Sequence, residues 1–158
     1  MFARITLVLL AGLTVGGCIS QQGPVEFVDP LMAWTVGYSA EEGADLSPAV
    51  QEADDIRLSM ACRPHAGAVD ITFVGRRGDP AVIELRSGGA RRRYPASGQD
   101  DEENIGGVDF DFNAPTTDPV LTRFANTGEL SIIIGKRRIL LPNAFASAHD
   151  FLAICRPL

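Results

Sequence analysis

The residues of this chain best suited to covalent chemistry are its three cysteines, Cys18, Cys62 and Cys155. A thiol can pair with another thiol, bind a metal or accept an acyl chain. In an exported protein, an odd number of cysteines normally leaves one thiol free or joined to another molecule. The first question is therefore which of the three stands apart from the other two.

Cys18 follows a segment with the features of an export signal. Arg4 is the only charged residue ahead of an apolar run over 5–15, which is interrupted only by Gly and Thr. This run of about 11 residues is too short for a membrane-spanning helix, which needs roughly 20. The sequence VGGC that ends at Cys18 resembles the lipobox of bacterial lipoproteins. The resemblance implies a diacylglyceryl group on the Cys18 sulfur, removal of residues 1–17, and acylation of the new amino terminus.

The alternative is an ordinary secretory signal with an incidental cysteine. Several acyl chains would make the anchor permanent, since each buried methylene contributes about 0.8 kcal/mol. By the sorting behaviour of bacterial lipoproteins, Ile19 in place of an aspartate implies the outer membrane. Residues 18–30 contain Gln, Gly and Pro and are expected to form a flexible tether.

The rest of the chain, 31–158, is long enough for one domain that buries roughly two thirds of its unfolded surface. The full chain has 14 basic and 20 acidic residues, a formal net charge of −6. This balance argues against a general affinity for nucleic acid or anionic lipid.

Basic residues nevertheless gather in three clusters, Arg76-Arg77, Arg91-Arg92-Arg93 and Lys136-Arg137-Arg138. They fall at predicted turns or strand starts, and we interpret them as solvated hairpin ends. The alternative is a single patch that binds phosphate or an acidic partner.

Acidic residues suggest a calcium site only weakly. Asp109, Asp111 and Asn113 alternate as at the start of a calcium loop, but the later glycine and bidentate glutamate are missing. We favour a strand whose polar side chains face solvent and whose Phe110 and Phe112 point inward. The like-charge run at 100–103 is expected to stay solvated.

We recognise no catalytic arrangement in the sequence. His149 and Asp150 are neighbours on a predicted helix and should diverge by about 100°, so we do not expect a base with an orienting carboxylate. Ser87 lacks a Gly-x-Ser-x-Gly elbow, and no phosphate-binding loop surrounds Gly88. His65 and His149 show no metal-ligand spacing near Cys62 or Cys155. The sequence predicts no enzyme activity, cofactor or metal site.

Strands dominate the predicted elements. Alternating apolar and polar residues predict strands over 31–39, 55–62, 69–73, 81–85, 91–94 and 108–113. Polar stretches at 40–54 and 97–107 are expected to be loops. Strands this close together leave no room for crossover helices, so they should form an antiparallel meander.

Two helices and a hairpin complete the prediction. Asp118 and Gly128 are typical caps for a short helix, and a hairpin follows over 130–141. The segment AFASAHDFLAIC at 144–155 predicts a second helix. Its apolar stripe comprises Ala144, Ala148, Phe151 and Cys155, widened by Phe145 and Leu152. The fold class is β-rich α+β: an antiparallel meander sheet or partly open barrel, with the C-terminal helix packed across one face.

Cys62 and Cys155 are expected to form a disulfide. Ile56, Leu58, Met60 and Cys62 share one face of their strand, and Cys155 lies on the apolar stripe of its helix. Both thiols would point into the same interface. In an oxidising periplasm they should pair, and closing a loop of about 93 residues contributes roughly 4 to 5 kcal/mol. The alternative is two buried, unpaired cysteines.

Two further resemblances concern the mature chain. Trp34 and the segments DIRLSMAC, LTRFANTGEL and FLAIC resemble small exported alphaproteobacterial proteins of unknown function, which implies architecture and a paired cysteine. Over 60–98, the segments MACRPHAGAVDITFV, AVIELRSGGAR and YPASG resemble the first half of membrane-bound inhibitors of vertebrate-type lysozyme, which are lipid-anchored antiparallel barrels. The inhibitory loop of that family is present only in pieces, at Gly89-Ala90-Arg91 and Ala96-Ser97-Gly98.

The sequence therefore predicts a lipoprotein with a signal peptide at 1–17, a lipidated tether at 18–30 and one periplasmic domain at 31–158. We expect it to be anchored to the outer membrane through Cys18 and to act as a non-catalytic binding or structural module of the cell envelope. A protein partner in the envelope is expected, and nucleic acid is not. The alternatives are a lipid-anchored lysozyme inhibitor and, third, an envelope hydrolase.

Overall fold

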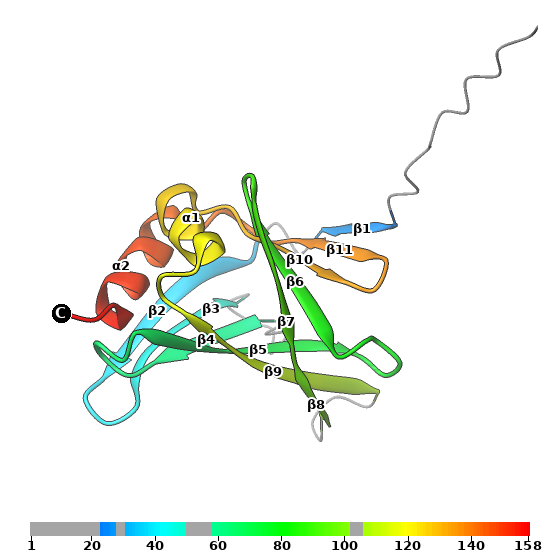
Figure 1. The fold of residues 1–158 in the computed structure, drawn as a ribbon, viewed down its shortest axis with the longest axis horizontal. Coiled ribbons are helices and arrows are strands. Elements are labelled where there is room, and N and C mark those ends of the chain that lie inside the picture. Colours follow the sequence, from blue (N-terminus) through cyan, green and yellow to red (C-terminus); the bar gives the residue numbers. More distant parts are fainter. Residues whose placement is uncertain (1–22, 28–30, 50–57, 102–105) are drawn as a thin grey trace, which may run out of the picture.

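The computed structural model describes residues 23–27, 31–49, 58–101 and 106–158. The expected signal peptide, Cys18, Ile19 and Ile56 lie outside the described residues. The described chain folds into two sheets and two helices (Figure 1).

The larger sheet has six strands, and every pairing in it is antiparallel. Its spatial order is β2 (Ala33–Ser39), β3 (Gly43–Ala49), β4 (Leu58–Cys62), β5 (Ala68–Arg76), β9 (Gly107–Pro115) and β8 (Ser97–Asp100). The inner face of this sheet is apolar because side chains alternate along each strand. In β4, for example, Leu58, Met60 and Cys62 are buried, as the sequence predicted.

The smaller sheet has five strands. Its order is β1 (Val25–Phe27), β11 (Arg137–Leu140), β10 (Ser131–Ile134), β6 (Val82–Ser87) and β7 (Ala90–Pro95). All pairings are antiparallel except that of β1, which lies parallel to β11. Its inner face is equally apolar, since Ile83, Leu85, Ile132 and Ile134 are fully buried.

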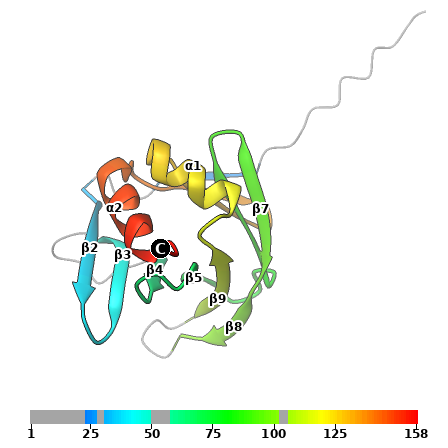
Figure 2. The ribbon, with the colours of Figure 1, turned by 60° about the vertical axis from the view of Figure 1, so that its left-hand side comes forward.

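The two helices fill the side on which the sheets diverge (Figure 2). Helix α1 (Pro119–Thr127) contacts β6 and β7, and helix α2 (Phe145–Cys155) contacts β2 and β3. The helices also pack against each other. The result is a β-rich α+β fold with antiparallel sheets that do not close into a barrel, and with the C-terminal helix across one sheet. This confirms the predicted fold class.

Helix α1 begins and ends where the sequence predicts. The Asp118 carboxylate accepts a hydrogen bond from the Val120 backbone N–H at 2.8 Å. Gly128 adopts a left-handed conformation with φ of 70°, which favours glycine, and its N–H donates to the Phe124 carbonyl. A side-chain cap therefore fixes the start of this helix, and a glycine backbone conformation fixes its end.

Helix α2 is joined covalently to the larger sheet. Cys62, the last residue of β4, forms a disulfide with Cys155, the last residue of α2, and their Cα atoms lie 5.7 Å apart. Both cysteines are buried. The predicted pairing is confirmed, and the alternative of two unpaired thiols is wrong.

The turn after β4 holds the same end of α2. The backbone N–H of His65 donates to the Ile154 carbonyl, and that of Gly67 donates to the Cys155 carbonyl, both at 2.9 Å. The last carbonyls of a helix have no partner within the helix. Here the β4–β5 turn satisfies two of them beside the disulfide.

Four local predictions were wrong. The stretch 40–54, predicted as a loop, contains β3, and Ser97–Asp100, also predicted as loop, forms β8. In β3, buried Ala44 and Leu46 alternate with exposed Asp45, whereas β8 is polar and exposed throughout. Both strands form because partner strands supply their hydrogen bonds. The predicted meander is also interrupted, because β5 and β6 belong to different sheets. Phe145 does not widen the apolar stripe of α2, since it is 58% exposed at the first turn.

The predicted tether is not flexible along its whole length. Val25–Phe27, which lie within the expected 18–30 tether, form β1 and pair with Arg138–Leu140 of β11. The folded domain therefore starts ahead of residue 31. Parallel pairing to β11 places this strand at the edge of the smaller sheet (Figure 1).

Among the described residues, no helix is long and apolar enough to cross a membrane.

Candidate functional site

The outer face of the smaller sheet collects arginines from distant parts of the chain. Strand register aligns Arg138 of β11 with Ile133, Glu84 and Arg93 across β10, β6 and β7. In the next row, Arg86 of β6 lies opposite Arg91 of β7. We call the outward side chains of Arg86, Arg91, Arg93 and Arg138 the basic face.

The dimensions of this face follow from sheet geometry. Neighbouring strands lie about 4.8 Å apart, so three strand intervals place Arg138 and Arg93 roughly 14 Å apart at their Cα atoms. Residues 83, 85, 92 and 94 alternate with the basic positions and point to the interior or toward α1. The basic face therefore presents a broad positive surface on a rigid sheet.

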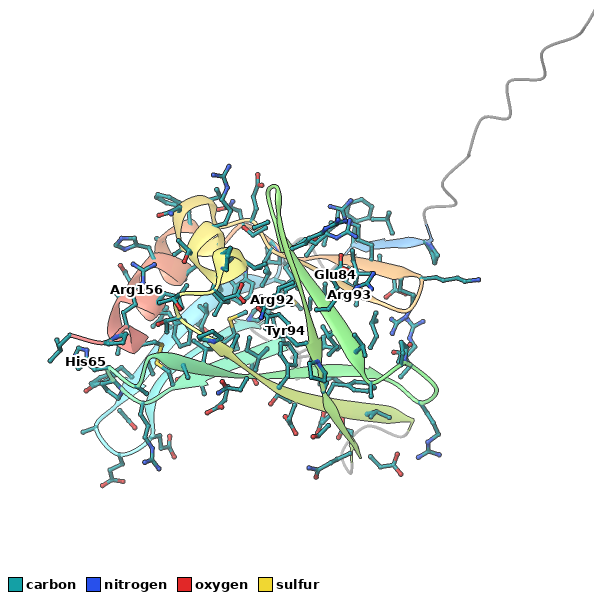
Figure 3. The ribbon with its side chains drawn as sticks, viewed as in Figure 1. His65, Glu84, Arg92, Arg93, Tyr94 and Arg156 are labelled. Carbon is teal, nitrogen blue, oxygen red and sulfur yellow. A yellow bond between two sulfur atoms is a disulfide. The ribbon has the colours of Figure 1, made fainter. Side chains whose placement is uncertain are left out.

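A single carboxylate lies at its centre. Glu84 is only 6% exposed, and its oxygens accept hydrogen bonds from Arg86 Nε at 2.5 Å and Arg93 Nε at 2.8 Å. Glu84 and Arg93 are seen side by side on this sheet in Figure 3. Burial raises the pKa of Glu84, but the hydrogen bonds and charges of Arg93 and Arg86 outweigh it and hold the pKa below its ordinary value. Glu84 thus holds the side chains of Arg86 and Arg93 in place and offsets one of their two positive charges.

Two hollows border Arg86 and Arg138. One, of about 460 Å³, lies toward the end of α1 and is also lined by Ser131 and Leu140. The other, of about 270 Å³, lies toward β1 and is also lined by Val25. Each hollow is therefore bordered by the same two guanidinium groups, whose planar donor arrays suit phosphate and carboxylate oxygens.

Apolar side chains are exposed along the same face. Val25 and Phe27 of β1 align with Arg138 and Leu140 of β11 and therefore point to the same side of the sheet. Phe27 is 78% exposed and Val25 is 43% exposed. The basic face thus has an apolar margin at β1.

Three other members of the basic clusters, Arg76, Arg77 and Arg137, form ion pairs outside the basic face. Arg137 forms ion pairs with Glu26 and Asp79, and Arg76 lies 3.4 Å from Glu26. Arg77 pairs with Asp100 at 3.1 Å, within the predicted acidic run. No cluster therefore lies on the basic face with all of its members. One arginine of the third cluster and two of the second join the basic face.

Arg92 points to the opposite side of β7. Its Nε lies 3.8 Å from the buried carboxylate of Asp118. Beside it, the Tyr94 ring stacks on Phe112 with centroids 5.1 Å apart. Burial raises the pKa of the Tyr94 hydroxyl well above its usual value, and the nearby Asp118 charge adds to this, although the two groups do not reach hydrogen-bond geometry. This group helps to hold α1 against β7.

The outer face of the larger sheet has the opposite charge. Asp45, Asp70 and Asn113 share one row across β3, β4, β5 and β9, and Asp111 lies in a neighbouring row. Thr72 Oγ1 donates to Asp111 at 2.6 Å, and Asn113 donates to Asp70 at 2.8 Å. This confirms the predicted wet strand face, opposite buried Phe110 and Phe112. The described residues contain no group of three or more potential metal ligands.

His149 and Asp150 are closer than the sequence predicted. Nδ1 of His149 lies 3.3 Å from Oδ1 of Asp150, because both side chains are exposed and can turn toward each other at the helix surface. The expectation that they diverge is wrong. His65 lies at the C-terminal end of α2, where Nδ1 is 3.0 Å from the Arg156 carbonyl oxygen. The exposed pair of His149 and Asp150 lacks the buried, fixed geometry of a catalytic dyad.

The two pieces that resemble a lysozyme-inhibitory loop lie apart. Gly89-Ala90-Arg91 is at the start of β7, and Ala96-Ser97-Gly98 follows its end. The full length of β7 separates them, so they do not form one loop.

Comparisons with known proteins give no family: no family model, no curated protein and no solved structure matches this chain significantly.

Sequence reasoning missed Glu84 and Arg86 as members of this site. Alternation around buried Ile83 and Leu85 does place them on one side of a strand. No sequence pattern, however, gives the register that brings β6 beside β10 and β7. The basic face is therefore a product of strand pairing between distant segments.

Proposed function

We propose that this protein is an outer-membrane lipoprotein, anchored through Cys18, whose periplasmic domain is a non-catalytic binding or structural module of the cell envelope. The observation that carries the proposal is the Cys62–Cys155 disulfide. It accounts for two of the three cysteines and leaves Cys18, which directly follows the export-signal pattern. A buried disulfide is also typical of an oxidising compartment.

The basic face supports binding as the role of the domain. Its arginines are held on paired strands rather than on loops, so their positions are fixed before a ligand arrives. Two bordering hollows and an apolar margin give this surface a shape as well as a charge. An acidic or anionic partner is the chemistry that such a surface fits.

Labelling with a fatty-acid analogue tests the anchor. Cells producing the full chain should incorporate the label, and mass spectrometry should locate the acyl groups on residue 18. The Cys18→Ser variant should incorporate none and should leave the outer-membrane fraction. The Cys62→Ser/Cys155→Ser variant is the matched control and should still be labelled. An unlabelled wild-type chain would overturn the proposal.

A further inference from the structure

We propose that the basic face lies against an anionic phospholipid bilayer, with Phe27 and Val25 at the membrane interface. This inference rests on the proposed anchor at Cys18 and specifies the surface that the anchor presents to the membrane. It reverses the expectation drawn from the net charge of −6, which argued against affinity for anionic lipid.

The anchor brings this particular sheet close to the bilayer. Gly23 is five residues after Cys18 and two residues before Val25, the first residue of β1 at the edge of the smaller sheet. Five residues of fully extended chain span at most about 18 Å. The edge of the smaller sheet is therefore within that distance of the lipid headgroups, whatever the path of the chain between them.

Charge distribution decides which of the two outer sheet faces lies against the lipid. The basic face presents four arginines against two carboxylates: Glu84, which is buried, and the exposed Glu129, which lines the hollow of about 460 Å³ beside Arg86 and Arg138. Each basic residue near an anionic bilayer contributes about 1 kcal/mol, or roughly fivefold in binding. On the outer face of the larger sheet, Asp45, Asp70 and Asp111 would be repelled by the same bilayer. The net charge hides this separation because it sums both faces.

The apolar margin favours a bilayer over a dissolved anion as the occupant. Phe27 is 78% exposed beside Leu140 on the side of the sheet that carries Arg138. A free phosphate ion gains no binding energy from exposed apolar side chains. Contact with a membrane interface, in contrast, combines insertion of apolar side chains with attraction of basic residues. The margin also lies on β1, the strand nearest the anchor.

Arginine footprinting tests this arrangement. Acylated protein purified from membranes is reconstituted into vesicles of phosphatidylcholine alone, or of phosphatidylcholine with one quarter phosphatidylglycerol. Both samples are treated with phenylglyoxal, and the modification rate of each arginine is read by mass spectrometry. We expect Arg91 and Arg138 to react at least about fivefold more slowly in the anionic vesicles. Arg63 and Arg156, at the far end of α2, should change less than twofold.

Matched variants identify the cause of the protection. Arg91→Gln/Arg138→Gln should bring the modification rates of Arg86 and Arg93 in the two vesicles closer together, because two of the four charges that favour the contact are lost. Arg63→Gln/Arg156→Gln removes the same charge and should leave the protection unchanged, because Arg156 lies away from Glu84 and Arg93 (Figure 3). Circular dichroism confirms that each variant is folded.

The same samples separate this inference from the proposed anchor. The acyl mass on Cys18 reports the anchor, and the footprint reports the face. Acylated protein with equal rates in the two vesicles would overturn the basic face as the membrane contact and leave the anchor intact. Equal protection of Arg63 and Arg156 would overturn it too. Chains without an acyl mass would overturn both.

Discussion

Cys62 and Cys155 each end their element, and the disulfide between them joins the third strand of the larger sheet to the end of the last helix. In the turn that follows Cys62, His65 and Gly67 donate backbone hydrogen bonds to carbonyls at the end of α2. Covalent and hydrogen-bonded contacts thus hold the same helix terminus.

Removal of this disulfide should cost stability. In the chain-entropy model, opening the loop of 93 residues lowers the free energy of unfolding by about 4 to 5 kcal/mol. Cys62→Ser/Cys155→Ser should therefore show a lower urea midpoint, measured by the change in Trp34 fluorescence. Cys18→Ser is the control and should keep the wild-type midpoint. Rapid alkylation of both thiols in unreduced native protein would contradict the pairing.

Replacing Ile19 tests sorting. If the protein follows the lipoprotein rule, Ile19→Asp should keep the acyl group but move the chain from the outer-membrane to the inner-membrane fraction. Sucrose-gradient fractionation measures the shift. Ile19→Val should remain in the outer membrane, and an unchanged position of both variants would count against the predicted sorting signal.

Glu84 should make stability depend on pH. Its pKa is lowered in the folded state, so its stabilising contribution is present above the ordinary value of 4.5 and is lost as the pH falls through the lowered pKa. Glu84→Gln should lose about 1 to 3 kcal/mol at pH 7 and show a weaker loss below pH 4.5 than the wild type. Urea denaturation at several pH values measures both effects. Glu129→Gln, an exposed carboxylate near the same sheet, is the control and should behave as wild type.

The cap at Asp118 should matter more for its oxygen than for its charge. Asp118→Ala removes the acceptor of the Val120 N–H and should destabilise the fold by about 1 kcal/mol, up to 2. Asp118→Asn retains a capping oxygen and should lose less. Thermal unfolding followed by circular dichroism compares the two variants. Equal losses would instead point to the charge of Asp118 beside Arg92.

Lysozyme should be unaffected by this protein. The two pieces that resemble the inhibitory loop lie at opposite ends of β7 and cannot enter one active site as a unit. Turnover of a vertebrate-type lysozyme on cell walls should therefore stay constant when the purified protein is added in molar excess. A known lysozyme inhibitor serves as the positive control. Saturable inhibition would restore the alternative function.

Patterns within single segments explain what could be predicted. The caps at Asp118 and Gly128 and the alternation of Leu58, Met60 and Cys62 depend on neighbours close in sequence, so the elements were predicted correctly. The cysteine pair followed because two apolar faces must meet in one core. The exposure of Phe145 did not follow, because only packing between α1 and α2 decides how far the stripe extends.

The sequence by itself determined the export pattern, the helix ends and the pairing of two sulfurs. Tertiary structure alone decided that β3 and β8 are strands and that Arg86, Arg91, Arg93 and Arg138 share one surface. The physical reason is that strand pairing takes its hydrogen bonds from distant segments. No single segment determines its register against a distant strand. The separation of charge between the two sheets therefore arises only when the strands pair.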